Sequence, residues 1–168
     1  MRFLFITLLF LFKQLRCDSI FISTDSSVVS TTTSYSFFYF VETDLTPVVG
    51  SNFSITLPSE YASRLTNGNT TCTVTWSLPI TVPSVSCSLS DMLITVQGLF
   101  SSAVTFQAAN GDYFDVRVDN ILNPYSAVTP GNFIARTTVS GGTITATGQV
   151  SSPFSAGSMT CSIATSPT

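Results

Sequence analysis

Carboxylates are the side chains in this sequence that could do chemistry, because its 168 residues include nine Asp and Glu and no histidine. The single lysine is Lys13, close to the N-terminus. Without an imidazole or an amine in the rest of the chain, catalytic triads, His-based zinc sites and Schiff bases lose their central group. A pair such as Asp115 and Asp119, or Glu42 and Asp44, could serve a glycosidase only at a set separation across a cleft. The spacing favours no such pair, and we therefore predict a protein without catalytic activity.

The densest acidic stretch is NGDYFDVRVDN, residues 110–120. If this stretch is a strand, Asp115 and Asp119 lie on the same face as Arg117, because side chains alternate between the two faces. The pattern favours a solvated face on which these charges compensate one another, with no cofactor. The alternative is calcium, which takes oxygen ligands in flexible sets. Its candidate ligands are Asn110, Asp112, Asp119 and Asn120.

The N-terminal residues predict a secretory signal peptide. The chain begins with a methionine and an arginine, and residues 3–12 are an apolar run, FLFITLLFLF. A run of this length suits a signal peptide, whereas a membrane-spanning helix needs about 20 residues; an uncleaved anchor is the alternative. We place cleavage near Cys17, which predicts a secreted protein that a partner could hold at the cell surface. The resulting division is a signal peptide at 1–17 and a single domain at 18–168, with its core over about 25–165.

Removal of the signal peptide leaves an acidic chain. Its basic side chains are Arg64, Arg117 and Arg136, against all nine carboxylates, so its net charge by count is near −6. Such a surface cannot neutralise phosphates, which excludes nucleic acid and anionic membranes as partners. The partners that we expect are proteins or glycans at the cell surface or in an extracellular matrix.

Cysteines of a secreted protein pair by default, because the compartment is oxidising. Cys72 and Cys87 are the predicted pair, since they bracket TVTWSLPITVPSVS, which has the pattern of a strand, a Pro-containing loop and a strand. Such a bridge would join neighbouring strands and stabilise the fold by about 3 kcal/mol in the loop-entropy model. Cleavage after Cys17 leaves Cys161 without a partner in this chain, whereas retention of Cys17 allows a bond between these two.

Alternation of apolar and polar residues dominates the rest of the chain, and no segment carries a long helical stripe. About nine or ten short strands are separated by Pro, Gly and Asn turns, and Gly141-Gly142 suits a tight hairpin turn. This pattern predicts an all-β fold, an antiparallel β-sandwich. The predicted strands include 35–41, 71–76, 84–89, 92–98, 103–108, 113–120, 132–140 and 143–150.

The stretch SYSFFYF contains five aromatic rings, from Tyr35 to Phe40. In a strand, Tyr35, Phe37 and Tyr39 share one face, while Phe38 and Phe40 share the other. Because neither face is polar throughout, the run predicts a strand that is covered on both faces and whose rings fill the core. An exposed ligand platform is the alternative.

Four pieces of the sequence occur in an order that resembles a known kind of repeat. They are SYSFFYF with NFSITLPSEY, CTVTW…SVSCSLSDMLITVQGLF, FDVRVDNILNPYS and GNFIARTT. Together they resemble an immunoglobulin/fibronectin-like β-sandwich repeat of large secreted or surface proteins of ciliates and other protists. The resemblance implies an extracellular scaffold or adhesive module and carries over no catalytic residues. The sequence departs from antibody domains, since Trp76 lies only four residues after Cys72 and Cys87 follows eleven residues later.

Two functions fit these observations. The first is a non-catalytic structural or adhesive module, whose sequons at Asn52 and Asn69 predict N-glycosylation. The alternative is a lectin-like carbohydrate-binding domain, in which exposed rings stack on sugars. Its candidate stacking residues are Trp76, Tyr61 and Tyr125.

Overall fold

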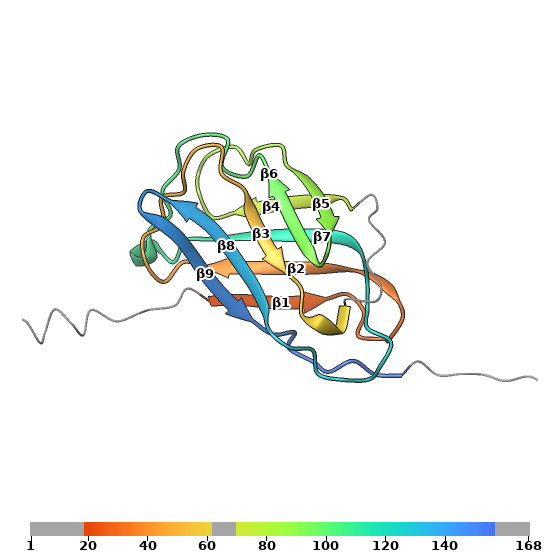
Figure 1. Ribbon diagram of the computed structural model, residues 1–168. Coiled ribbons are helices and arrows are strands. Elements are labelled where there is room, and N and C mark those ends of the chain that lie inside the picture. Colours follow the sequence, from red (N-terminus) through yellow and green to blue (C-terminus); the bar gives the residue numbers. More distant parts are fainter. Residues whose placement is uncertain (1–18, 62–69, 157–168) are drawn as a thin grey trace, which may run out of the picture.

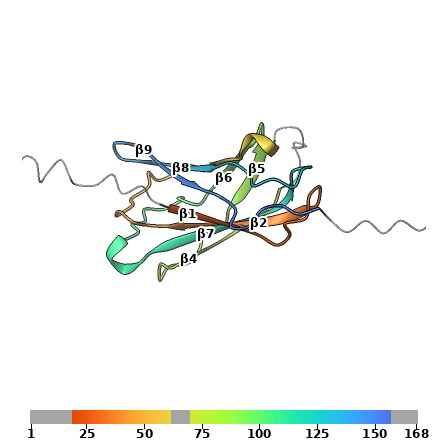
Figure 2. The same ribbon diagram turned by 90° about the horizontal axis from the view of Figure 1, so that it is seen from below.

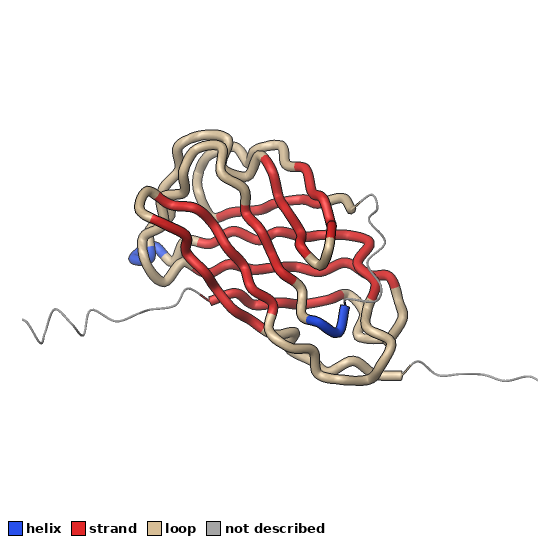
Figure 3. The backbone as a smooth tube through the Cα atoms, viewed as in Figure 1, coloured by secondary structure: helices blue, strands red, loops and turns tan. Residues whose placement is uncertain are grey.

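A computed structural model describes residues 19–61 and 70–156, whose regular structure is almost entirely strand (Figures 1 and 3). The predicted signal peptide, Cys17, Asn69 and Cys161 lie outside the described residues. Two 3₁₀ turns, η1 (Ser59–Tyr61) and η2 (Ala108–Asn110), accompany the strands. The strands are β1 (Ser19–Thr24), β2 (Thr32–Phe40), β3 (Phe53–Thr56), β4 (Cys72–Trp76), β5 (Ser86–Ser90), β6 (Leu93–Gln97), β7 (Tyr113–Leu122), β8 (Phe133–Val139) and β9 (Gly142–Gly148).

These strands form one continuous sheet in the order β4-β7-β2-β1-β9-β8-β3-β6-β5. The sheet folds over, so that the half from β4 to β1 faces the half from β9 to β5 (Figures 1 and 2). Every strand pairing is antiparallel except that of β1 with β9, which is parallel. The all-β prediction is therefore confirmed. The prediction of a purely antiparallel sandwich is corrected, because a parallel pair joins the two halves into a single sheet.

The two halves meet where β1 passes β9. Ser19 pairs with Thr147 at this point. The next residue is Gly148, where a Cβ atom would stand 2.0 Å from the carbonyl oxygen of Ile20. That oxygen belongs to the backbone of β1 and has little freedom to move aside. Glycine is therefore required at this position for the two halves to approach so closely.

Alternation along β2 directs its aromatic rings into the core. Tyr35, Phe37 and Tyr39 are each at most 1% exposed. The ring of Phe37 lies 5.8 Å from that of Phe133 in β8, and the ring of Tyr39 stacks 4.8 Å from that of Phe114 in β7. These contacts bind β2 both to its neighbour in the sheet and to the facing half. Burial of one such ring contributes about 1.5–3 kcal/mol, so this strand is a main source of stability.

The outer face of β2 is only partly covered, which corrects the prediction that both faces are buried. Ser36, Phe38 and Phe40 on this face are all of intermediate exposure. The sheet packs on its inner side and meets solvent on its outer side, as antiparallel sheets commonly do. The run of aromatic residues therefore contains both core rings and surface rings.

The segment 103–108 is a loop and not the predicted strand. Phe106 forms an isolated bridge with Leu45 and is fully buried, and Val104 is buried too. An extended loop that buries every second side chain has the same alternation as a strand. The apolar pattern of this segment thus indicates its burial correctly but not its pairing.

A polar network lies inside the core. The hydroxyl groups of Tyr35 and Tyr61 are 2.8 Å apart, and Tyr35 also donates to Oδ1 of Asn123. Nδ2 of Asn123 donates to the carbonyl oxygens of Ser26 and Val28, each at 2.8 Å. The network ties η1 and the chain after β7 to the loop between β1 and β2. It also supplies partners to polar groups whose burial would otherwise be costly.

The buried tyrosines predict unfolding at alkaline pH. Burial raises the pKa of Tyr35 from 10.0 to about 12, although hydrogen bonding to Tyr61 lowers it in part. Burial and the neighbouring Tyr35 also raise the pKa of Tyr61. Because the pKa is higher in the folded state, this stabilisation is complete below pH 10.0 and is lost as the pH rises toward about 12. For Tyr35 it corresponds to about 2–3 kcal/mol.

A pH titration that records tyrosinate absorbance and near-UV circular dichroism together tests this prediction. We expect the near-UV signal to disappear cooperatively between pH 10.0 and about 12, in the step in which the buried tyrosines ionise. The Tyr35→Phe variant is the control, since fewer tyrosines should ionise in that step. Ionisation of Tyr35 with the near-UV signal intact would contradict the prediction.

Candidate functional site

Four aromatic rings gather on the outer side of β1, β2 and β7. Phe21 lies directly opposite Phe38 in the pairing of β1 with β2, and Phe40 lies opposite Tyr113 in the pairing of β2 with β7. The rings of Phe38 and Tyr113 stack with their centroids 4.7 Å apart. Phe21 is 62% exposed, and the other three side chains are partly exposed. We call these four side chains the aromatic face.

Two carboxylates border the aromatic face. Asp115 is the cross-strand partner of Phe38, and Glu42 follows the end of β2. The Oγ atom of Ser36 donates to Asp115 at 3.3 Å, and the Oγ atom of Ser19 donates to Glu42 at 2.8 Å. Negative charge therefore lies at the rim of the ring cluster.

Asp115 is held in an environment that does not favour its charge. Its Oδ1 atom is buried and has no hydrogen-bond partner among the described residues. Burial raises the pKa of Asp115, and the hydrogen bond from Ser36 and the charge of Arg117 oppose this rise only in part. A further positive charge near the aromatic face would therefore stabilise the ionised carboxylate.

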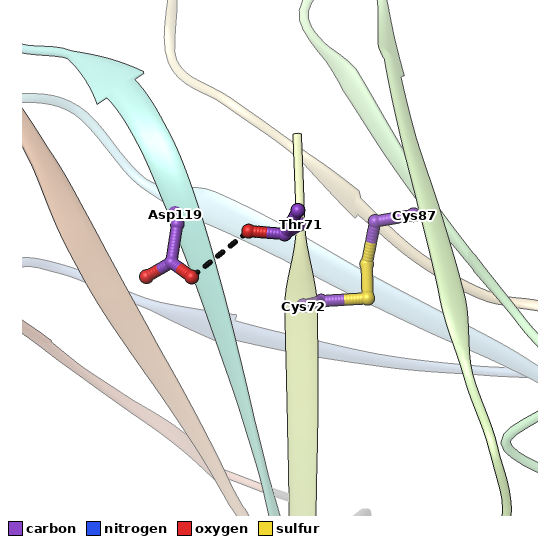
Figure 4. The surroundings of a disulfide bond; sticks show 4 residues. All are labelled: Thr71, Cys72, Cys87 and Asp119. Atoms are coloured by element: carbon purple, nitrogen blue, oxygen red, sulfur yellow. Dashed lines mark hydrogen bonds between the residues drawn. A yellow bond between two sulfur atoms is a disulfide. The ribbon is translucent and has the colours of Figure 1, made fainter. Parts of the chain in front are cut away.

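The opposite end of this outer surface is polar. Arg117 forms an ion pair with Asp25, and its Nε atom lies 3.6 Å from Oδ1 of Asp119. Ser34 donates to Asp119 at 2.6 Å. Thr71 donates to the same carboxylate at 3.0 Å (Figure 4). These two hydrogen bonds lower the pKa of Asp119. Asp25 and Asp119 therefore compensate Arg117 on this surface. The prediction holds for Asp119, whereas Asp115 is partly buried and accepts a hydrogen bond from Ser36.

The structure separates the four candidate calcium ligands. Two of them precede β7 and two lie near its C-terminal end, so about 20 Å of extended strand separates the pairs. Asp112 accepts hydrogen bonds from the backbone N–H of Gln107 at 2.7 Å and from the hydroxyl of Ser77 at 3.0 Å, and it organises the loop that enters β7. Within the described part of the chain, no group of three or more His, Cys, Asp or Glu could hold a metal ion. The pair Asn110 and Asp112 therefore cannot bind the same ion as the pair Asp119 and Asn120.

Two of the three predicted sugar-stacking residues are buried. Trp76 is 9% exposed, packs edge-on against Phe106 with centroids 6.0 Å apart, and donates from Nε1 to the carbonyl oxygen of Ile80 at 3.1 Å. Tyr61 belongs to the buried polar network. Tyr125 is 60% exposed, but it follows β7 and so lies at the opposite end of that strand from the aromatic face. The prediction is therefore wrong for Trp76 and Tyr61, because core packing uses both of their rings.

An exposed ligand platform at residues 34–40 is the alternative interpretation of the sequence, but the rings that β1 and β7 add to the aromatic face could not be assigned to it. The run around Phe38 predicts a covered strand, and neither Phe21 nor Tyr113 carries a signal when considered alone. One signal was available in the segment IFIS, where Phe21 stands between Ile20 and Ile22. If the two isoleucines point inward, Phe21 must point outward.

Exposed aliphatic side chains lie on loops at the same end of the molecule as the aromatic face. β2 ends and β7 begins at this end, and β4 ends beside the start of β7. The loops that follow β2 and β4 leave these strands at this end (Figure 1). Val48 and Val49 are exposed in the first loop, and Ile80 and Val82 are exposed in the second. This end of the molecule therefore presents apolar groups on its loops as well as on its strands.

A disulfide joins the two edge strands of the sheet. Cys72 of β4 and Cys87 of β5 are linked, with their Cα atoms 5.8 Å apart (Figure 4). These strands are consecutive in the chain but stand at opposite ends of the strand order. The expectation that the bridge joins neighbouring strands is corrected accordingly. The bond closes the folded sheet across its two edges.

Comparison of the sequence finds no matching family model and no matching curated protein. Among solved structures, the chain is similar to BslA, described as a bacterial hydrophobin, with a TM-score of 0.51 and 18% sequence identity. The alignment covers 87% of this chain and 99% of BslA. The similarity concerns the fold. Among the described residues, no helix has the length and apolar character needed to cross a membrane.

Proposed function

We propose that this chain is a non-catalytic, secreted module that acts by surface contact, in a structural or adhesive role at the cell surface or in an extracellular matrix. The observation that carries the proposal is the aromatic face. A cluster of exposed rings on one side of a soluble domain commonly marks an interaction surface. The exposed valine and isoleucine side chains on the adjoining loops extend the same apolar end.

Three further observations support this proposal. The fold is similar to that of a bacterial hydrophobin, and we extend a structural surface role to this chain by analogy. The disulfide suits a secreted protein. Two carboxylates, Asp112 and Asp119, hold a loop and a strand end in place and so have structural roles. We include in the proposal that the chain is an immunoglobulin/fibronectin-like β-sandwich module of the kind found in protist surface proteins.

Glycosylation at Asn52 and Asn69 belongs to the same proposal. The side chain of Asn52 is exposed immediately before β3, where a glycan would project into solvent. A secreted chain passes through the compartment in which such sequons are used. A glycan at this position would not disturb the core, since Asn52 points outward and the next residue, Phe53, points inward.

The Phe21→Ser variant is expected to lose adhesion while it keeps its fold. Phe21 is 62% exposed, so its replacement should change the free energy of unfolding by no more than about 0.5 kcal/mol. We expect at least a fivefold loss in retention on intact cells of the source organism, measured with the purified full chain. The matched control is Tyr125→Ser, because Tyr125 is 60% exposed and lies at the other end of β7. Equal retention of both variants would show that the aromatic face does not mediate adhesion.

Carbohydrate binding is the second candidate function, and we propose the aromatic face as its site in place of Trp76 and Tyr61, which are buried. The rings of the aromatic face lie beside the hydroxyl of Ser36 and the carboxylate of Asp115. Exposed rings with polar groups at their margin can stack on a sugar and accept hydrogen bonds from its hydroxyl groups. Binding of a neutral oligosaccharide that disappears in Phe21→Ser would favour this candidate.

A further inference from the structure

The aromatic face combines rings with negative charge, and this combination favours a ligand that carries positive charge. Phe21 and Phe38 face each other across β1 and β2, and Asp115 is the next residue across the sheet from Phe38. Glu42 adds a second carboxylate at the end of β2. Ring faces carry a negative quadrupole that attracts cations, and a nearby carboxylate reinforces that attraction.

The described part of the chain does not use its own cations to cover this charge. Residues 19–61 and 70–156 contain two basic side chains, Arg117 and Arg136. The guanidinium of Arg117 is paired with Asp25, and that of Arg136 lies near the hydroxyl of Thr56 on the other half of the sheet. Arg117 therefore influences Asp115 only as a neighbour on β7.

Asp115 is the residue through which a cation would act. Asp115 is partly buried, so the effective dielectric constant around it is lower than that of water. Its attraction for a cation at the aromatic face is therefore stronger than that of a fully exposed carboxylate. An incoming positive charge would also relieve the cost of burying the ionised carboxylate. Anionic groups such as phosphates would instead be repelled by this rim and by the acidic chain as a whole.

We infer that the aromatic face docks a segment of a partner protein that presents arginine side chains, a planar guanidinium stacking on Phe21 or Phe38 beside the carboxylate of Asp115. This inference rests on the proposed adhesive function and specifies the partner. Arginine suits the site better than lysine, because its planar guanidinium stacks on a ring and is more weakly hydrated than an ammonium group.

Binding of defined peptides to the full-length chain tests this inference. The probes are a decapeptide of alternating Ser and Arg, the same peptide with Glu in place of Arg, and the neutral sugar cellohexaose. We expect the arginine peptide alone to bind, and its affinity to fall as NaCl is raised from about 20 mM to about 500 mM, since salt screens exposed charges. Isothermal titration calorimetry gives the dissociation constants.

Variants of the face separate the ring contribution from the charge contribution. Phe21→Leu keeps an apolar side chain but removes the ring, and Asp115→Asn removes the charge. Phe21→Leu should weaken binding of the arginine peptide by about two- to fivefold, the usual contribution of a cation–π contact at an exposed ring. Asp115→Asn should weaken it by about tenfold, because it removes a charge-assisted hydrogen bond. The matched controls, Tyr125→Ser and Asp91→Asn, alter an exposed ring and an exposed carboxylate elsewhere and should change the affinity by less than about twofold.

Asp115→Asn should fold at least as stably as the parent, because burial disfavours the charge that it removes. Thermal unfolding of each variant verifies that the fold is intact. Failure of the parent chain to bind the arginine peptide, or an equal loss in the controls, would overturn the inference. So would binding of the glutamate peptide, or binding of cellohexaose that depends on Phe21, which would identify a glycan as the occupant.

The outcome also distinguishes this inference from the proposed function. If retention on cells requires Phe21 but the arginine peptide does not bind, the inference about the partner is wrong and the adhesive role stands. If neither retention nor peptide binding depends on Phe21, both are wrong. An effect of Phe21→Ser on retention with no effect of Asp115→Asn on peptide binding indicates an apolar occupant in place of a cationic one, which also overturns the inference.

Discussion

Phe37→Ala is expected to lower the free energy of unfolding by about 3–5 kcal/mol, the usual cost of removing a buried phenylalanine ring. Phe37 is fully buried, and its ring lies 6.1 Å from that of Tyr35 and 5.8 Å from that of Phe133. Its strand, β2, is paired on both sides, with β1 and with β7. A cavity at this position would loosen the contact between the two halves of the sheet. Urea denaturation followed by fluorescence measures the difference.

The adjacent residue on the same strand is the matched control. Phe38 has the same side chain, but it points outward and stacks on Tyr113. We expect Phe38→Ala to cost only about 0.5–1.5 kcal/mol, the usual contribution of a ring pair. Equal costs for the two variants would show that the outer face of β2 is covered, as the sequence pattern predicts. Such a result would contradict the exposure of the aromatic face.

Removal of the disulfide is the second large effect that we expect. Replacing both Cys72 and Cys87 with alanine should lower the free energy of unfolding by about 3 kcal/mol, since the bond closes a loop of 15 residues. β4 pairs with β7 alone and β5 pairs with β6 alone, so no strand pairing crosses between them. The covalent bond is thus the direct link between these two edges among the described residues.

The consequence should be local as well as global. Without the bond, we expect amide hydrogen exchange to accelerate in β4 and β5 more than in β2, which lies inside the sheet. Reduction of the parent chain with dithiothreitol should lower its melting temperature to that of the double variant, and the variant itself should not respond to the reductant. If reduction leaves the melting temperature of the parent chain unchanged, packing alone is sufficient to hold β4 and β5 together, and the prediction is wrong.

These two experiments address different parts of the fold. Phe37 tests the packing between the facing halves, and the disulfide tests the closure of the sheet at its edges. The adhesive surface is separate from both, because Phe21 points away from the core. Stability and adhesion should therefore respond to different substitutions.

Local sequence determined several features of this protein. Period-2 alternation was sufficient to predict an all-β fold, because side chains of any strand alternate between two faces. The same rule placed Tyr35, Phe37 and Tyr39 together on one side of β2, where the structure buries them. The spacing of Cys72 and Cys87 around a Pro-containing loop was sufficient to select them as a pair.

Tertiary structure decided which of these faces meets solvent and which residues meet each other. Trp76 and Tyr61 could have been surface rings by their sequence, yet the facing strands and loops bury them. The candidate calcium ligands are close in sequence but lie at the two ends of one extended strand. Burial and proximity depend on what packs against a segment, and period-2 alternation carries no information about that.

The aromatic face is the clearest case. Phe21 and Phe38 are 17 positions apart in the sequence, and only the register of β1 against β2 places them opposite each other. β4 and β5 are consecutive in the chain, yet the strand order sends them to opposite edges of the sheet, where the disulfide joins them. The sequence by itself determined most of the strands and the alternation of side chains along each of them. The pairing of distant strands, which is set by long-range contacts, decided the surface that the protein presents.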